Sequence, residues 1–468
     1  MAIVLSAKRL ALLPGSDTVE TDRRVTIADG ALTVGEARAG ACDTDLVVAS
    51  PVNAHDHGYG MRTLAFGCAD DALESWIAHL RLRPRTDPYL EALVAFGRLA
   101  KTGVAATMHC HNSLNADRLA EEAAAVARAA ADVGIRLALS CPLLDRDPWV
   151  YGGPERLKAH LNDEDWALLS PHVPRYRPID AQLMTVEATA DALENERVRV
   201  QYGPIGPQWC SNELLEAIAE ASLSSGRRIH MHLLESPRQR RWLDARFPQG
   251  VVAYLDAIGF LSPRLAIAHG VQLRPDEIEL LRARGVQLVT NPSANLRLRS
   301  GVAPLAEAFG RGLSFAVGLD GTGFDDDQDL WREMRVLRLL HGGREMATAL
   351  PGPAVFKAAI ETGRIVAGFE DATDIALIDY AALTEDLLFD DLDLCEMLLT
   401  RMRAPYASGL IVDGRWVMRD GNLLGVDFDA ARRELLAQAR ADLPRLRRER
   451  RIAALLGDAI RDHYQAME

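Results

Sequence analysis

The feature that most constrains the fold of this chain is a series of eight short apolar segments separated by stretches of helical character. Repeated alternation of strand and helix predicts a parallel sheet, and eight such units over roughly 310 residues fit a (β/α)8 barrel. A doubly wound open sheet is the alternative that the alternation alone leaves open. The predicted strands cover residues 46–57, 103–109, 135–140, 198–203, 228–232, 265–269, 286–290 and 314–320.

Short β-type segments at both ends of the chain predict a second, smaller domain. They precede the barrel segments and return after residue 362, where Asp413-Gly414 is a hairpin signal. We expect the two groups to pair into one β-sandwich. A long, Arg-rich amphipathic helix should follow, with its charges facing solvent. The expected boundaries are 1–50 and 362–427 for the β-sandwich, 51–361 for the barrel, and 428–468 for the C-terminal helix.

Charge and composition limit the classes of partner. The net charge of −13 argues against non-specific nucleic-acid binding, which needs a basic surface. The sequence has no apolar stretch near the ~20 residues that a membrane span needs, and its six cysteines form no CxxC pair. We therefore expect a cytoplasmic, homo-oligomeric enzyme with a small-molecule substrate, and no nucleic-acid or membrane partner.

Two histidines lie at the end of the first predicted strand. His55 and His57 are two residues apart, so on a strand they point to the same face. At the carboxyl end of a barrel strand, that face looks into the mouth where enzyme sites collect. Two neutral imidazoles side by side are half of a metal site. A pair of histidines in a polar turn is the alternative if this motif is taken alone.

Further polar residues end the later strands in the same phase. His230 and His232 share a face of the fifth strand, and Glu235 follows it; His269 ends the sixth strand and Asp320 the eighth. A single histidine at a strand end is usually a satisfied structural residue. Several at the same end of one barrel, together with a carboxylate, indicate a metal-dependent active site.

These motifs resemble the amidohydrolase superfamily, in particular its cytosine-deaminase-like aminohydrolase branch, over nearly the whole chain. The resemblance implies that Glu235 carries protons, that His269 lies beside the reacting water, and that His230 has at most a supporting role. It also implies that Asp320 is both a ligand and a proton acceptor. The implied metal ligands are His55, His57, His232 and Asp320, and the matching motifs are His55-x-His57, His232-x-x-Glu235, Ala268-His269-Gly270, Gly318-Leu319-Asp320-Gly321 and Asn291-Pro292-Ser293-Ala294-Asn295.

The resemblance also implies a reaction and a metal stoichiometry. Members that bind two metals bridge them with a modified lysine on strand four, but residues 198–203 contain no lysine. We therefore expect one divalent ion per chain, zinc or, as the alternative, iron. The implied reaction is hydrolytic removal, as ammonia, of the exocyclic amine of a small N-heterocycle or cyclic amidine. Hydrolysis of a cyclic amide or another C–N bond, and a non-catalytic metal-binding barrel, are the alternatives.

Substrate contacts are the least determined part of the prediction. Many aminohydrolases of this branch carry a histidine after strand four, where this chain has Gln208 and Trp209. An amide can pair with the edge of a heterocycle and an indole can stack on it, although a Pro/Gly turn with a buried tryptophan explains the stretch equally well. His109 and His111 share a face of the second strand. They are candidates for the pocket wall, or for buried hydrogen-bonded residues.

Overall fold

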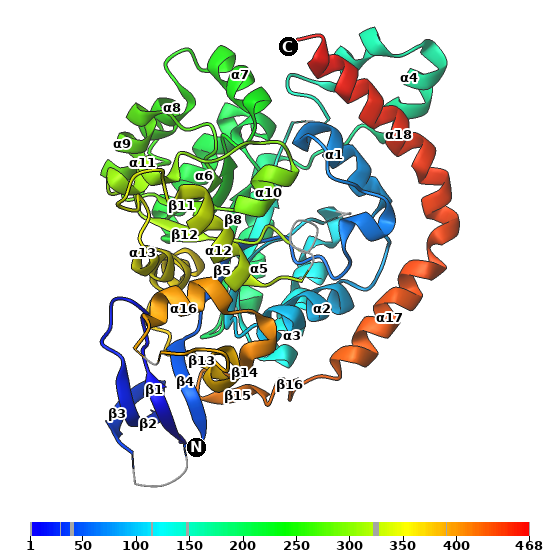
Figure 1. Cartoon of the computed structure of the whole chain (residues 1–468). Helices are drawn as coiled ribbons and strands as arrows, with labels where there is room; N and C mark the ends of the chain where they lie inside the picture. The colour runs from blue at the N-terminus through cyan, green and yellow to red at the C-terminus, as the bar shows by residue number, and fades with distance from the viewer. Residues whose placement is uncertain are drawn as a thin grey trace.

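Eight parallel strands form the centre of the molecule (Figure 1). The computed structural model describes residues 2–28, 30–37, 42–113, 116–146, 149–321, 327–389 and 391–467. Each barrel strand pairs with the next in sequence order, from β5 to β12. The strands are β5 (Val52–Asp56), β6 (Ala106–Cys110), β7 (Arg136–Leu143), β8 (Val198–Pro204), β9 (Ile229–Leu233), β10 (Leu265–His269), β11 (Gln287–Thr290) and β12 (Phe315–Val317).

The barrel closes at the carboxyl ends of its first and last strands. The backbone N–H groups of Leu319 and Asp320 both donate to the carbonyl oxygen of His55, at 3.0 and 2.9 Å. Gly318 allows this close approach, because a Cβ at that position would lie 2.6 Å from the Cβ of His55. The predicted (β/α)8 barrel is therefore confirmed, and its closure joins two of the predicted site residues directly.

A second sheet unites both ends of the chain, as the sequence predicted. Its strand order is β16-β15-β14-β13-β4-β1-β2-β3. The first half comprises β1 (Ile3–Leu10), β2 (Glu20–Ala28), β3 (Ala31–Glu36) and β4 (Thr44–Ala49). The second half comprises β13 (Ile375–Ile378), β14 (Ala407–Val412), β15 (Arg415–Arg419) and β16 (Asn422–Leu423).

One predicted strand proves to be two. Residues 46–57 were expected to form a single barrel strand, but β4 belongs to the second sheet and only β5 belongs to the barrel. The chain changes sheets at Ser50-Pro51. Proline has no backbone N–H to donate to a neighbouring strand, which favours a break there.

Helices surround the barrel and cover its mouth (Figure 1). A π-helical turn, Ala358–Thr362, joins α13 to α14. No helix of the described residues is long and apolar enough to cross a membrane. The helices before the C-terminal region are α1 (Leu73–His79), α2 (Pro88–Lys101), α3 (Leu119–Val133), α4 (Asp163–Leu169), α5 (Ile179–Leu193), α6 (Asn212–Ser225), α7 (Pro237–Arg246), α8 (Val251–Ala257), α9 (Pro275–Ala283), α10 (Pro292–Arg297), α11 (Leu305–Gly310), α12 (Leu330–His341), α13 (Gly352–Lys357), α14 (Gly363–Ala367), α15 (Tyr380–Leu383) and α16 (Leu394–Arg401).

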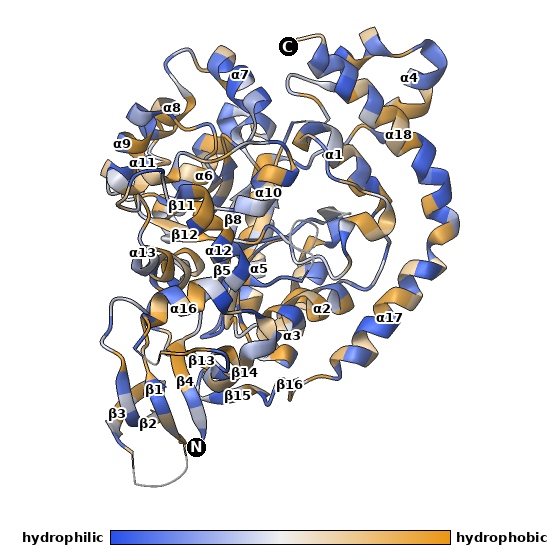
Figure 2. Ribbon diagram, viewed as in Figure 1, coloured by the Kyte–Doolittle hydropathy of each residue, from blue (hydrophilic) through white to orange (hydrophobic). Residues whose placement is uncertain are grey.

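The C-terminal region runs as an arc along one side of the molecule, from β16 to the neighbourhood of α1 and α4 (Figure 1). The single long helix predicted from the sequence is divided into α17 (Phe428–Ala441) and α18 (Leu443–Gln465). Pro444 lies in the first turn of α18, where a proline is tolerated but ends the preceding helix. Hydrophilic and hydrophobic segments alternate along both helices (Figure 2), as expected of an amphipathic arc.

Candidate active site

Four of the predicted site residues converge at the mouth of the barrel. His55 and His57 come from the end of β5, His232 from β9, and Asp320 from just after β12. Nε2 of His55 and Nε2 of His57 lie 3.2 and 3.1 Å from Oδ1 of Asp320. One ligand atom from each of the four residues lies within 4.8 Å of all the others. The strand ends therefore bring together the set that was predicted to bind metal.

Hydrogen bonds at the outer ring nitrogens fix the protonation of two of these histidines. Nδ1 of His57 lies 3.0 Å from the carbonyl oxygen of Cys110, and Nδ1 of His232 lies 2.8 Å from that of Ile205. A carbonyl oxygen only accepts, so each Nδ1 carries the proton and donates it. In the neutral ring the other nitrogen, Nε2, then has a free lone pair. This arrangement is typical of metal-binding histidines.

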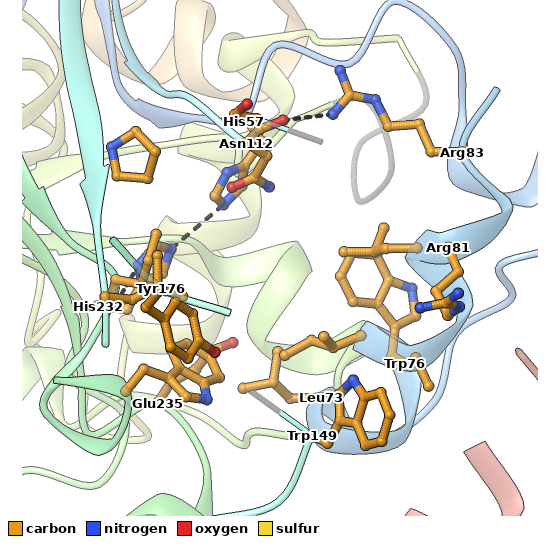
Figure 3. A pocket seen from close by; sticks show the side chains of 18 of the residues that line it. His57, Leu73, Trp76, Arg81, Arg83, Asn112, Trp149, Tyr176, His232 and Glu235 are labelled. Atoms are coloured by element: carbon orange, nitrogen blue, oxygen red, sulfur yellow. Dashed lines mark hydrogen bonds between the residues drawn. The ribbon is translucent and has the colours of Figure 1, made fainter. Parts of the chain in front are cut away.

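The inner nitrogens face one another beside Asp320. Nε2 of His57 and Nε2 of His232 are only 3.4 Å apart (Figure 3). Burial lowers the pKa of His57, but the neighbouring carboxylate of Asp320 outweighs it and raises that pKa above the usual value. Burial lowers the pKa of His55 and His232 well below the usual value, which keeps these rings neutral. Burial alone would raise the pKa of Asp320, but its contacts with the rings of His55 and His57 hold it well below its usual range. Neutral imidazoles and a carboxylate are ligands that suit Zn²⁺ or Fe²⁺.

His269 stands beside this group with one ring nitrogen unused. Its Nδ1 lies 2.8 Å from Oδ1 of Asn295, which accepts a hydrogen bond from it. Its Nε2 is buried without a partner among the described residues and lies 3.8 Å from Oε2 of Glu235. Burial lowers the pKa of His269. Nε2 is therefore available as a hydrogen-bond acceptor in the cavity.

The surroundings of Glu235 favour its uncharged, protonated form. Burial raises its pKa well above the usual value, and the negative charges of Asp320 and Glu74 raise it further. Its backbone N–H donates to Oε1 of Gln239 at 2.8 Å. Ser236, the next residue, caps α7 by accepting from the N–H of Gln239 at 3.1 Å, and its hydroxyl donates to Glu74. The helix cap thus fixes the backbone at Glu235.

Strained backbone positions gather at the same strand ends. Leu234, His269 and Asp320 have φ values of 52°, 75° and 58°, in the left-handed region that residues other than glycine rarely adopt. Such strain costs about 1–3 kcal/mol per residue, and it persists where surrounding structure enforces it, often at functional sites. At these positions the left-handed conformation turns the chain at the strand ends, where Glu235, His269 and Asp320 lie at the mouth of the barrel.

A cavity of about 430 Å³ opens from the predicted metal ligands. This volume lies within the range of roughly 300–1,000 Å³ that is typical of small-molecule sites. Glu235, His57 and His232 lie on one side, while Leu73, Trp76 and Trp149 face them from the opposite side (Figure 3). The cavity therefore has a polar end at the strand termini, and an apolar group on the opposite side, where Arg81 and Arg83 also line it (Figure 3).

The predicted substrate contacts divide into two groups. Trp209 lines the cavity, but Gln208 is not among the described residues that do. Gln208 is 1% exposed, and neither amide atom has a partner among the described residues. Its side chain lies over Gly206, where a Cβ would be 2.6 Å from Nε2 of Gln208. The structure places only the indole of this pair at the cavity.

His109 and His111 do not line the described part of the cavity either. Nε2 of His109 lies 3.2 Å from Nδ1 of His111, and Nε2 of His111 lies 2.9 Å from Oε2 of Glu122. Both histidines are buried, at 3% and 5% exposure. They form a hydrogen-bonded cluster inside the protein, which is the structural alternative that the sequence left open. His230 is also internal: its Nε2 lies 2.8 Å from Nδ1 of His55.

The apolar end of the cavity contains residues that the sequence did not single out. Trp76 and Ala78 come from α1, and Trp149 comes from the segment after β7. Leu456 and Ile460 come from α18, more than a hundred residues after the barrel closes. Their heptad-like spacing was visible in the sequence, but it also fits an ordinary buried helix face. No local pattern indicated that this face meets a cavity.

Comparison with known proteins gives consistent results. The sequence profile of the amidohydrolase family matches residues 46–366. The 5'-deoxyadenosine deaminase of Methanothermobacter thermautotrophicus is 29% identical over 429 residues, 87% of this chain and 90% of that protein. The 5-methylthioadenosine/S-adenosylhomocysteine deaminase of Thermococcus kodakarensis is 27% identical, covering 81% and 84%. A zinc-bound adenosine deaminase from Xanthomonas campestris has a similar fold, with a TM-score of 0.77 at 20% identity over 95% of this chain and 98% of that one.

Proposed function

The chain belongs to the amidohydrolase family, and we propose that it is a metal-dependent deaminase that removes the exocyclic amine of a 6-aminopurine ring as ammonia. The observation that carries the proposal is the convergence of three histidines and Asp320, with Glu235 and its raised pKa beside them, at one end of a ligand-sized cavity. The purine ring is proposed because the relatives are named as deaminases of adenosine derivatives.

The metal ligands we propose are His55, His57, His232 and Asp320, holding one divalent ion per chain, zinc or else iron. The fit rests on the close approach of the four ligand atoms, on the carbonyl oxygens that engage Nδ1 of His57 and of His232, and on the low pKa of Asp320. When bound there, such an ion supplies the Lewis acidity that makes a water molecule nucleophilic at neutral pH. A sequence without a lysine on β8 supports the single ion.

Three side chains then divide the proton transfers of the reaction. The unprotonated Nε2 of His269 accepts a hydrogen bond from the attacking water and orients it toward the ring carbon. Asp320 takes one proton of the water, while Glu235 gives its own proton to the adjacent ring nitrogen. The proton on Asp320 passes to the amine, which leaves as ammonia as the C–N bond breaks. The second proton of the water returns Glu235 to its acid form.

An ammonia-release screen tests the proposal. The metal-loaded protein should release ammonia from 5'-deoxyadenosine or methylthioadenosine, and Glu235→Gln should release it roughly 100-fold more slowly or less. Loaded protein that leaves every aminopurine intact but opens a cyclic amide would support the alternative hydrolase. Homo-oligomerisation and a cytoplasmic location stay predictions from the sequence, which size-exclusion chromatography and cell fractionation would test.

A further inference from the structure

Part of the cavity wall is made by α18. Leu456 and Ile460, one helical turn apart, both line the cavity. They are 1% exposed and belong to a buried apolar cluster that also includes Ala78 and Trp149. We call the part of the cavity that is lined by Ala78, Trp149, Leu456 and Ile460 the distal chamber. It joins three segments that are far apart in the sequence.

Polar contacts along its length fix α18 against the segments around the mouth. Arg81 pairs with Glu449 at 3.2 Å, and Arg461 pairs with Asp71 at 2.9 Å. The backbone N–H of Tyr151, within the segment that supplies Trp149, donates to the hydroxyl oxygen of Tyr464 at 3.0 Å. Contacts before, after and beside Leu456 and Ile460 therefore hold this part of the helix in place. The wall that α18 contributes to the distal chamber is therefore held in place by these contacts.

The two ends of the cavity differ in chemistry, and this orients a ligand. The amine of a bound aminopurine has to face Glu235, His269 and the proposed metal ligands. Positions on the imidazole side of the purine then point away from them, toward the side on which Leu73, Trp76 and Trp149 lie (Figure 3). An apolar wall favours an apolar substituent there, because each buried CH₂ contributes about 0.8 kcal/mol in transfer from water.

We propose that α18 determines substrate specificity: the distal chamber binds an apolar substituent, alkyl, alkylthio or aryl, carried by the ring on the side remote from the amine. Leu456 and Ile460 are the specificity-determining residues. The identity of the ring rests on the proposed function, whereas the preference for an apolar substituent rests on the chamber itself.

The test compares two probes, 9-methyladenine and 9-benzyladenine, with each protein preparation. The ratio of kcat/KM for the benzyl compound to kcat/KM for the methyl compound does not depend on how much of the preparation is folded. In the wild type this ratio should be on the order of 10 to 100, the scale expected for burying a phenyl group.

Two variants change the distal chamber. Ile460→Ala removes part of its wall and Ala78→Leu fills it, so each should lower the ratio about tenfold or more. Leu446→Ala is the matched control, since Leu446 is a buried residue of α18 that is not among those lining the cavity.

A binding measurement separates this inference from the deaminase proposal. Quenching of tryptophan fluorescence by 9-benzylhypoxanthine and 9-methylhypoxanthine reports affinity without turnover. A benzyl preference that is lost in Ile460→Ala and Ala78→Leu, without ammonia release from any probe, would support the chamber and overturn the deaminase proposal. Ammonia release with equal ratios in the wild type, or with ratios that neither variant changes, would overturn the role of α18 and leave the deaminase proposal standing.

Discussion

Nδ1 of His55 lies 2.8 Å from Nε2 of His230, inside the barrel and away from the cavity. Both rings are fully shielded from solvent, at 0% and 1% exposure. If the proton between them stays on His55, its Nε2 keeps a lone pair that faces Asp320 at 3.2 Å. The first histidine of the His230-x-His232 motif thus orients a ligand from a different strand, while the second is itself a proposed ligand.

This relationship predicts that His230 supports metal binding. His230→Ala should weaken metal affinity by about 10- to 100-fold, the usual effect of losing the partner that orients a ligand. His230→Gln retains a hydrogen-bond acceptor and should recover part of the loss. Competition with a fluorescent chelator measures both. His341→Ala, a buried histidine on α12, is the control and should bind metal normally. Equal affinity in wild type and His230→Ala would contradict the assignment.

Glu235 is predicted to be needed for turnover but not for metal binding. Burial raises the pKa of its carboxyl group, which favours the protonated form, and Glu235→Gln keeps the shape while removing the transferable proton. We expect kcat to fall by roughly 100-fold or more, with metal content unchanged by elemental analysis. A variant that keeps most of its kcat would show that another group moves the proton.

Trp209 and its neighbour Gln208 should behave differently. Trp209 is 5% exposed, lines the cavity and contacts Tyr151, with ring centroids 6.2 Å apart. Trp209→Ala should therefore lose both kcat/KM and about 3–5 kcal/mol of stability. Gln208→Ala should leave kcat/KM close to that of the wild type. Thermal melts and kinetics on the same preparations decide this, and a kinetic loss confined to Gln208→Ala would reverse the assignment.

Glu333 on α12 makes stability depend on pH. Burial raises its pKa to about 7, although the backbone N–H of Ser293 donates to it at 2.7 Å. Between about pH 4.5 and 7 the folded state keeps this proton while the unfolded state has lost it. The contribution to stability is therefore complete below pH 4.5 and is lost as the pH rises through 7.

Glu333→Gln should remove that dependence, because an amide keeps the neutral form at every pH. Relative to the wild type, its free energy of unfolding should rise by up to about 3 kcal/mol between pH 4.5 and 8, at about 1.4 kcal/mol per pKa unit. Urea denaturation at several pH values gives the difference. A wild-type to variant difference that is constant across this range would mean that Glu333 is charged in the folded protein.

Removing the metal should destabilise the folded protein. Without a cation, the four proposed ligands, whose ligand atoms lie within 4.8 Å of one another, lose the ion that would hold them together. We expect chelation to lower Tm and one equivalent of Zn²⁺ per chain to restore it, with stabilisation that grows with the free metal concentration. Calorimetric titration of the apoprotein counts the sites. Two tight equivalents would contradict the single ion.

The sequence predicted the strand-end residues because barrel topology turns sequence position into spatial position. Once His57, His232 and Asp320 each follow a barrel strand, closure brings them to one mouth whatever the intervening loops do. The break between β4 and β5 was missed because both segments are apolar, and only Pro51 distinguishes them.

The far wall of the cavity depends on long-range packing and could not be predicted in the same way. Leu456 lies on a helix whose path around the molecule is set by contacts such as Tyr464 with Tyr151. The pairing of Asn295 with His269 likewise depends on how the turn after β11 sits against β10. Neither contact has a local sequence signature.

Because α18 supplies part of the distal chamber, substrate preference and catalytic chemistry can change independently during evolution. The proposed ligands all precede residue 321, whereas Leu456 and Ile460 lie on an amphipathic helix outside the barrel. Mutations that enlarge or narrow the chamber need not disturb the residues that perform the chemistry. Lineages of such a protein could exchange one substrate for another through drift in a single helix, and randomised libraries in the laboratory have the same short route to new substrates.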